Sequence, residues 1–203
     1  PLPSDEFLPL LRQLVLDSDN LSQLSSVSIL ANSLIKDSSQ LTTKDFVHFY
    51  QLLLSAYAQG HRRYVFITGT DTLSYLGAFL AEAFAGSDIC LVLTASMRPL
   101  LDSEQILEYT IDSHSDAYSN LEDALKLAAA AESGVKVCFG GESWAAQTVQ
   151  KIHSHDLMAF TGHSRAAYPA NSYVKTLPNT RRQHWIDDQH ALQDRINKQA
   201  EHS

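Results

Sequence analysis

Residues 64–72 read YVFITGTDT, and an apolar pattern with helical spacing follows at residues 73–84. The first four residues form a nearly continuous apolar run, which is typical of a parallel strand buried on both faces. Gly69 allows the backbone to turn sharply off this strand, and the threonines and Asp71 that follow are residue types that begin helices. This stretch therefore predicts a strand–loop–helix unit, the repeating element of α/β folds.

Similar units recur further along the chain. Apolar runs at residues 89–93 and 135–139 predict two more buried strands. An alanine-rich helix is expected between them at residues 121–131. A further helix is expected before the first strand, capped by Thr42 or Thr43 and ended by Gly60. The pattern predicts an α/β fold with a mostly parallel sheet flanked by helices.

The outer parts of the chain give weaker patterns. Residues 1–20 carry apolar side chains at helical spacing, and residues 27–35 are compatible with a strand. Residues 161–180 have the composition of a loop, and residues 181–201 are compatible with a helix that leads elsewhere or docks on a partner.

Composition limits the classes of function. The 203 residues suit one domain, or one domain with an appendage. They contain 15 Lys+Arg and 23 Asp+Glu, a formal charge of −8 that disfavours nucleic acid and anionic membranes as partners. No apolar stretch reaches the length of a membrane span.

The two cysteines, Cys90 and Cys138, both lie in apolar runs. We expect buried, reduced thiols rather than a disulfide framework, which favours a cytoplasmic location. Two cysteines are also too few for a cysteine zinc site. The first residue is Pro1, so the sequence says nothing about a signal peptide.

Ligands of open parallel sheets bind beyond the carboxyl ends of the strands, so the loops there are the candidate sites. In residues 69–72 the Thr70 hydroxyl would stand where the strand becomes a helix, and it could act as a nucleophile if a base lay within reach. On this tetrapeptide alone, simple capping of the helix is the more economical interpretation. Residues 37–40 and 94–99 are polar loops that could hold a small molecule, and the first of them alone suggests a turn and cap.

Lys151 would serve as a general base only if its surroundings favoured the neutral amine; otherwise it is a solvated lysine. Residues 153 and 155 form a His-x-His pattern, which on an extended segment places both rings on one face. No further ligands follow at matching spacing, so solvated histidines are the simpler interpretation.

Four segments, taken in order, resemble the bacterial-type L-asparaginase (asparaginase/glutaminase) family. They are YVFITGTDTL at 64–73, TASMRP at 94–99, SDAYSNL at 115–121 and KIHS at 151–154. The resemblance covers roughly residues 30–170 and is most specific in the Gly-Thr-Asp-Thr and Met-Arg-Pro segments. It implies the fold of the family's N-terminal domain.

The resemblance also implies roles for the residues that match. Thr70 would be the nucleophile, Lys151 would take its proton, and Asp71 would stand beside them and grip the substrate's α-amino group. Ser39 and Gln40 resemble the family's pair for the α-carboxylate and α-amino groups.

Ser96 falls where the family contacts the side-chain amide, and Asp116 and Asn120 match a motif that we interpret as mainly structural. The implied reaction is hydrolysis of L-asparagine to L-aspartate and ammonia, with L-glutamine as another substrate. No metal or organic cofactor is implied, and the family forms homodimers and homotetramers. One methylene separates the two substrates, and a pocket discriminates that by only about 1–3 kcal/mol.

The sequence departs from the family in two places. The family's Thr-Gly-Gly-Thr segment, which carries a second essential threonine on the first strand, does not occur. Residues 1–175 are thus expected to form the N-terminal α/β domain without its first strand. Residues 176–203 would form a linker or helix toward a C-terminal domain that is absent from these 203 residues.

Two other functions remain open. The first is a non-catalytic fragment or homologue that binds a small amino acid or serves as an assembly domain, which the missing threonine strand suggests. The second is a subunit of a glutamine-dependent amidotransferase that releases ammonia for tRNA-linked amidation. Because the chain is acidic, a partner subunit would then have to contact the RNA.

Overall fold

A four-stranded sheet lies at the centre of the computed structural model, which describes residues 9, 27–34, 36–101, 112, 114–164, 183 and 186–194. Its spatial order is the order of the chain: β1 (Arg63–Ile67), β2 (Cys90–Thr94), β3 (Gly134–Phe139) and β4 (Glu142–Ala145). The first three strands are parallel, and β4 pairs with β3 in antiparallel orientation. The expected α/β class with a mostly parallel sheet is confirmed.

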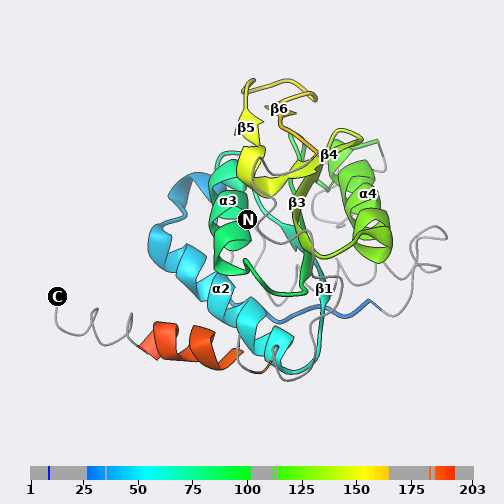
Figure 1. The fold of residues 1–203 in the computed structure, drawn as a ribbon. Helices are drawn as coiled ribbons and strands as arrows, with labels where there is room; N and C mark the ends of the chain where they lie inside the picture. Colours follow the sequence, from blue (N-terminus) through cyan, green and yellow to red (C-terminus); the bar gives the residue numbers. More distant parts are fainter. Residues whose placement is uncertain are drawn as a thin grey trace.

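Helices cover both faces of this sheet (Figure 1). Helices α2 (Thr43–Ala58) and α3 (Leu73–Ala83) pack on one face, and α4 (Asp116–Ala130) packs on the other. A short 3-10 helix, η2 (Ser38–Gln40), precedes α2, and a second one, η4 (Ala146–Thr148), follows β4. The two-stranded sheet of β5 (Gln150–Lys151) and β6 (Phe160–Thr161) lies outside the central sheet.

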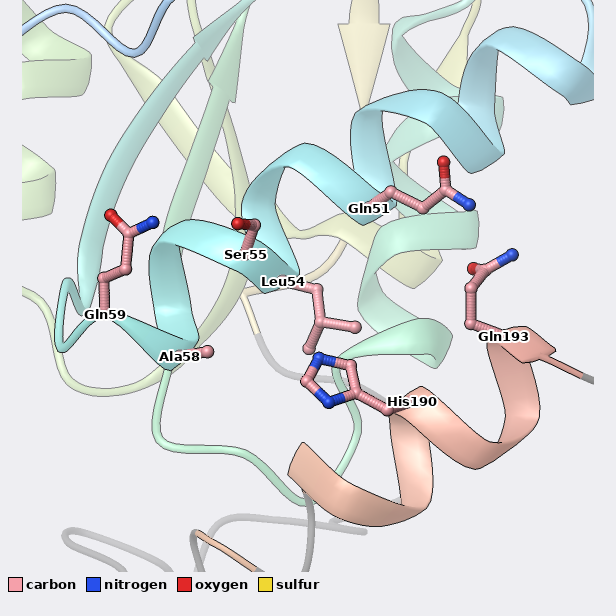
Figure 2. A pocket seen from close by; sticks show the side chains of 7 residues that line it. All are labelled: Gln51, Leu54, Ser55, Ala58, Gln59, His190 and Gln193. Atoms are coloured by element: carbon pink, nitrogen blue, oxygen red, sulfur yellow. The ribbon is translucent and has the colours of Figure 1, made fainter.

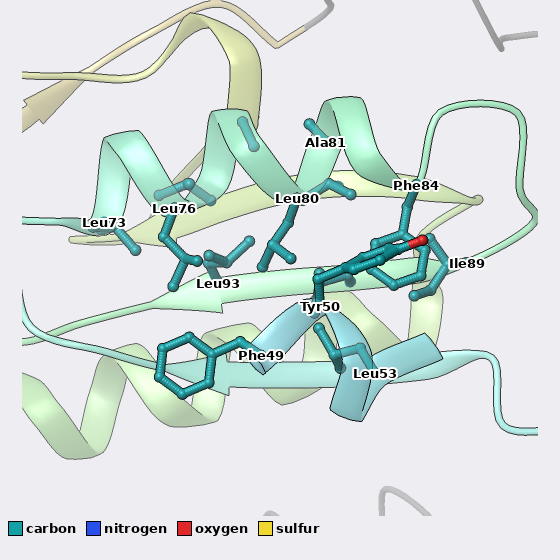
Figure 3. Packing of buried hydrophobic residues seen from close by; sticks show 14 of the residues in the cluster. Phe49, Tyr50, Leu53, Leu73, Leu76, Leu80, Ala81, Phe84, Ile89 and Leu93 are labelled. Atoms are coloured by element: carbon teal, nitrogen blue, oxygen red, sulfur yellow. The ribbon is translucent and has the colours of Figure 1, made fainter. Parts of the chain in front are cut away.

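The core follows the alternation of side chains along each strand. Leu91 and Leu93 of β2 face α2 and α3, whereas Val92 between them faces α4. Figure 3 shows the larger of the two sides, where Phe49, Tyr50 and Phe84 belong to one cluster with the aliphatic side chains of α3. Burial on both faces explains why β2 reads as a continuous apolar run.

The start of α2 is stabilised by polar contacts. The carboxylate of Asp45 accepts hydrogen bonds from the Thr42 backbone N–H and hydroxyl, each at 2.8 Å, as in a capping box. Lys36 Nζ lies 2.8 Å from the same carboxylate, and these bonds lower the pKa of Asp45 from 3.8 to about 2. At the other end of α2, Gly60 has φ +105°, the left-handed conformation that favours glycine after a helix.

Some boundaries differ from the sequence prediction. Helix α4 begins at Asp116 rather than at residue 121, because the Ser115 hydroxyl caps it by accepting the Ala117 N–H. The predicted strand at 27–35 is wrong over its described part, since residues 27–34 form no strand. The predicted helix at 1–20 lies outside the described residues, apart from residue 9, as does most of the loop predicted at 161–180. Residues 186–194 are helical, within the helix predicted at 181–201.

The helix at 186–194 packs on α2 (Figure 1). Ile186 is buried in the core, and the Tyr50 hydroxyl donates to Gln189 Oε1 at 2.6 Å. Within the described ranges, no helix combines the length and apolarity needed to cross a membrane.

Candidate active site

Two loops leave the carboxyl edge of the sheet side by side. The backbone N–H of Thr68 donates to the carbonyl of Thr94 at 3.0 Å, so the β1–β2 pairing continues past the end of β1. The chain then enters the loop that holds Thr70 and Asp71, while the neighbouring strand enters the loop that holds Ser96. The topology thus brings the predicted loops at residues 69–72 and 94–99 to one edge of the sheet, as expected for parallel strands.

The side chains of the first loop do not act as helix caps. Thr72 is the N-cap residue of α3, yet its side chain makes no capping hydrogen bond. The side chains of Thr70 and Asp71 instead contact Lys151. The economical capping interpretation of Gly69–Thr72 is therefore wrong.

Lys151 joins the site from a distant part of the chain. Its Nζ lies 2.9 Å from Thr70 Oγ1 and 2.8 Å from Asp71 Oδ1. The Lys151 side chain is 22% exposed, whereas that of Asp71 is 57% exposed. A hydroxyl, an amine and a carboxylate thus meet in one contact at the surface end of the sheet.

The hairpin formed by β5 and β6 places Lys151. Lys151 pairs with Phe160 across the hairpin, and the Phe160 ring packs edge-on against Phe139 of β3 with centroids 4.9 Å apart. The N–H of Ile152 donates to the carbonyl of buried Ala159 at 2.8 Å. The base of the hairpin is therefore fixed to the core, which holds the lysine near Thr70.

A cavity of about 390 Å³ opens beside this contact. Its lining combines all three predicted catalytic residues and the predicted Ser96 with residues of the Met-Arg-Pro and hairpin loops: Thr70, Asp71, Ser96, Met97, Arg98, Lys151, Ser154, His155 and Leu157. Sequence reasoning included Arg98 in a candidate loop without giving it a role, and it did not assign His155 to this site.

Ser39 and Gln40 do not line that cavity. Both are exposed on η2, where Asp37 accepts hydrogen bonds from the Ser39 N–H at 2.9 Å and from its hydroxyl at 2.7 Å. These bonds lower the pKa of Asp37. The structure thus places this predicted substrate-binding pair on the loop next to the site, with the Ser39 hydroxyl engaged by Asp37.

Ser38 is a residue that the sequence analysis missed. It is 8% exposed, and its side chain lies directly against Gly69, one residue before Thr70. A Cβ at position 69 would lie 2.5 Å from Ser38 Cβ and closer still to its Oγ. Gly69 is therefore required for close approach of the η2 loop, not for the sharp turn that the sequence suggested.

A second cavity, of about 400 Å³, lies between α2 and the helix at 186–194 (Figure 2). Its lining is mostly amide and small side chains: Gln51, Leu54, Ser55, Ala58, Gln59, His190 and Gln193. It contains none of the residues that the sequence predicted for catalysis or substrate binding.

No group of three or more His, Cys, Asp or Glu side chains is arranged to hold a metal ion in the part of the chain that the structure describes. His153 and His155 are both exposed on the hairpin loop. The metal interpretation of this His-x-His pattern thus gains no support from the described residues.

Comparisons with known proteins identify the family of this chain. The profile of the family Asparaginase, N-terminal matches residues 9–182. The chain is 31% identical over 139 residues to an L-asparaginase from Thermococcus kodakarensis, covering 68% of this chain and 38% of the relative. It is 34% identical over 121 residues to a probable L-asparaginase from Deinococcus radiodurans, covering 57% of this chain and 34% of the relative.

Solved structures show the same fold. A probable cytoplasmic L-asparaginase from Campylobacter jejuni aligns with a TM-score of 0.59 at 25% identity, covering 78% of this chain and 44% of that one. L-asparaginase I from Vibrio cholerae aligns with a TM-score of 0.60 at 22% identity, covering 76% and 43%, and supports the fold alone. The chain spans less than half the length of these relatives, and it belongs to the asparaginase family through that family's N-terminal domain.

Proposed function

We propose that the cavity beside Lys151 is an amidohydrolase site that hydrolyses L-asparagine to L-aspartate and ammonia, with Thr70 as nucleophile. The observation that carries this proposal is the 2.9 Å contact between Lys151 Nζ and Thr70 Oγ1. These two residues lie 81 positions apart in the chain, so the contact is made by the fold, and it supports Lys151 as the proposed base. The same contact would serve L-glutamine, which has one more methylene.

The proposed reaction needs a neutral Lys151. Its amine takes the Thr70 proton as the Thr70 oxygen attacks the side-chain amide carbon. The proton then passes to the leaving nitrogen, which departs as ammonia and leaves an ester on Thr70. Water hydrolyses the ester to L-aspartate and regenerates the hydroxyl. Backbone N–H groups in the first turn of α3 have no partner within the helix, and they would favour the negative charge that develops.

Asp71 has two roles in this scheme. In the structure its carboxylate pairs with Lys151 at 2.8 Å. The α-ammonium group of a bound substrate would compete for the same carboxylate. Substrate binding would thereby release Lys151 from this ion pair.

Ammonia release from L-asparagine and L-glutamine tests the proposal. Thr70→Val and Lys151→Met should each lower kcat by at least about a thousandfold. Matched controls are Thr161→Val, at an exposed threonine of β6, and Lys126→Met, at a lysine half-exposed on α4; both should keep the activity of the unchanged chain. Retention of most ammonia release in Thr70→Val or Lys151→Met would refute the assigned roles.

Binding without turnover is the second candidate. It predicts that calorimetric titration detects L-aspartate binding by a chain that releases no ammonia. Ammonia release that disappears in Thr70→Val would exclude it. The amidotransferase alternative predicts activity on L-glutamine only with a partner subunit.

The remaining proposals concern organisation. We assign residues 1–175 to the N-terminal domain and residues 176–203 to a linker or helix, with Ser39 and Gln40 on the substrate side of the domain. A homodimer or homotetramer is proposed, and light scattering after gel filtration would test it.

We place the protein in the cytoplasm because Cys90 and Cys138 are both free and buried.

A further inference from the structure

One face of α4 holds the backbone on both sides of Ser96. The Asp116 carboxylate accepts hydrogen bonds from the N–H of Met97 at 2.7 Å and of Arg98 at 2.9 Å. One turn later, Asn120 Nδ2 donates to the carbonyl of Ala95 at 2.9 Å. Side chains of a single helix therefore hold the loop backbone immediately before and immediately after Ser96.

The other end of the Asn120 amide reaches a different loop. Its Oδ1 accepts the N–H of Gly140 at 2.9 Å, and Gly140 begins the turn between β3 and β4 with φ +60°. A Cβ at Gly140 would lie 3.0 Å from the carbonyl oxygen of Leu157 and 3.4 Å from the sulfur of Met158. The turn thus lies directly against the hairpin that carries Lys151.

The chemistry of this position is restrictive. Asn120 is 2% exposed, and its surroundings require a donor toward a carbonyl and an acceptor toward an N–H in one short side chain. Asn provides both, whereas Asp lacks the donor and Leu lacks both. A buried polar group that loses its partner destabilises the fold, so one substitution here would weaken two loops together.

We infer that Asn120, assisted by Asp116, is a positioning residue that holds Ser96 and the Lys151 hairpin in a fixed relation. Asp116 acts on the Ser96 loop, and Asn120 acts on that loop and, through Gly140, on the hairpin. This goes beyond the structural role that the sequence suggested for the two residues. Its consequence for catalysis rests on the proposed function, but the positional claim does not.

The positional claim is tested by amide hydrogen exchange, followed by NMR on the chain without ligand. Asp116→Asn should speed exchange of the Met97 and Arg98 amides by about tenfold or more and leave Gly140 and Ile152 unchanged. Asn120→Leu should speed exchange at Gly140 and also at Ile152, whose N–H belongs to the hairpin. Asp123→Asn, the same chemical change elsewhere on α4, should alter none of them.

Kinetics then test the consequence. With L-asparagine, Asp116→Asn should raise KM with little change in kcat, whereas Asn120→Leu should lower kcat as well, because the hairpin positions Lys151. Unchanged exchange at the Met97 and Arg98 amides in Asp116→Asn, or at Gly140 in Asn120→Leu, would overturn the inference. The inference would also be overturned if Asp116→Asn and Asn120→Leu were both active and lost thermal stability but kept the KM and kcat of the unchanged chain.

If the unchanged chain releases no ammonia, the proposed function fails, and the exchange results still decide the positional claim. If Asn120→Leu does not fold, Asn120→Asp replaces it. This variant keeps the acceptor toward Gly140 and removes the donor toward Ala95, so exchange should rise around Ser96 and stay slow at Gly140. Slow exchange around Ser96 in that variant would also overturn the inference.

Discussion

The contact between Gly69 and Ser38 allows a quantitative test of how the η2 loop packs on the Thr70 loop. A Cβ at position 69 would lie 2.5 Å from Ser38 Cβ and closer to its Oγ, although carbon atoms in contact are normally about 3.5–4.0 Å apart. Gly69→Ala therefore forces Ser38 to move. Overpacking of this kind costs about 1–3 kcal/mol of the free energy of unfolding.

The same substitution should have the opposite effect once the Ser38 side chain is removed. In a Ser38→Gly background the nearest remaining Ser38 atom is Cα, at 3.6 Å, which is an ordinary contact. The φ angle of Gly69 lies outside the left-handed region, so alanine fits the backbone. Alanine also restricts the unfolded chain, and we expect Gly69→Ala to stabilise this background by about 0.4–1 kcal/mol.

The two single variants, the double variant and the unchanged chain form a double-mutant cycle, measured by urea unfolding followed by circular dichroism. The structure predicts a coupling free energy of about 1.5–4 kcal/mol, in the sense that Ser38→Gly rescues Gly69→Ala. Additive effects, within about 0.5 kcal/mol, would show that the two residues are not in contact and would refute the placement of η2 against the site.

Three further predictions concern other parts of the fold. The pKa of Asp45 is lowered to about 2 by Lys36 and Thr42; its contribution to stability is present above about pH 4 and is lost as the pH falls toward 2. Urea unfolding across this range should show a smaller loss in Asp45→Asn than in the unchanged chain. Burial raises the pKa of Cys138 to about 11 and also raises that of Cys90, so neither thiol should react with Ellman's reagent at pH 8 until urea unfolds the chain, and rapid reaction of the folded protein would contradict this. Gly77→Val should destabilise the chain by about 1–3 kcal/mol, because even a Cβ added at position 77 would lie 3.3 Å from the Cβ of Ala146 and 3.4 Å from a Cγ of Val137; an unchanged urea midpoint would contradict that close packing.

The parallel part of the fold was predictable because burial on two faces leaves a direct mark on the sequence. The strands at 64–67, 89–93 and 135–139 were found within one or two residues of their observed bounds. Strand β4 has a mixed burial pattern with Glu142 and Trp144 on it, so it lacked such a mark. The segment at 27–34 has the composition of a strand, but pairing with a neighbour decides whether a strand forms, and composition does not report pairing.

Some residues of the candidate site were likewise predictable from local sequence patterns, and others were not. Thr70 and Ser96 were predictable in place, because loops that follow parallel strands meet at one edge whatever their sequence. Lys151 was assigned only through a family resemblance, since its approach to Thr70 depends on β4, η4 and the hairpin.

That approach depends on packing that no local pattern shows. A Cβ at Gly162, just after β6, would lie 2.9 Å from Trp144 Cβ, and the Ala145 N–H donates to the carbonyl of His163 at 2.8 Å. The segment after β6 is thus held against β4. Because β5 pairs with β6, the position of β5 is fixed with it. The 2.9 Å distance between Lys151 and Thr70 therefore depends on how β4 and the β5–β6 hairpin pack beside the parallel strands. Tertiary packing thus positions the proposed base, so substitutions at Gly162 and Trp144, which do not line the cavity, should lower the ammonia release that we propose for this site.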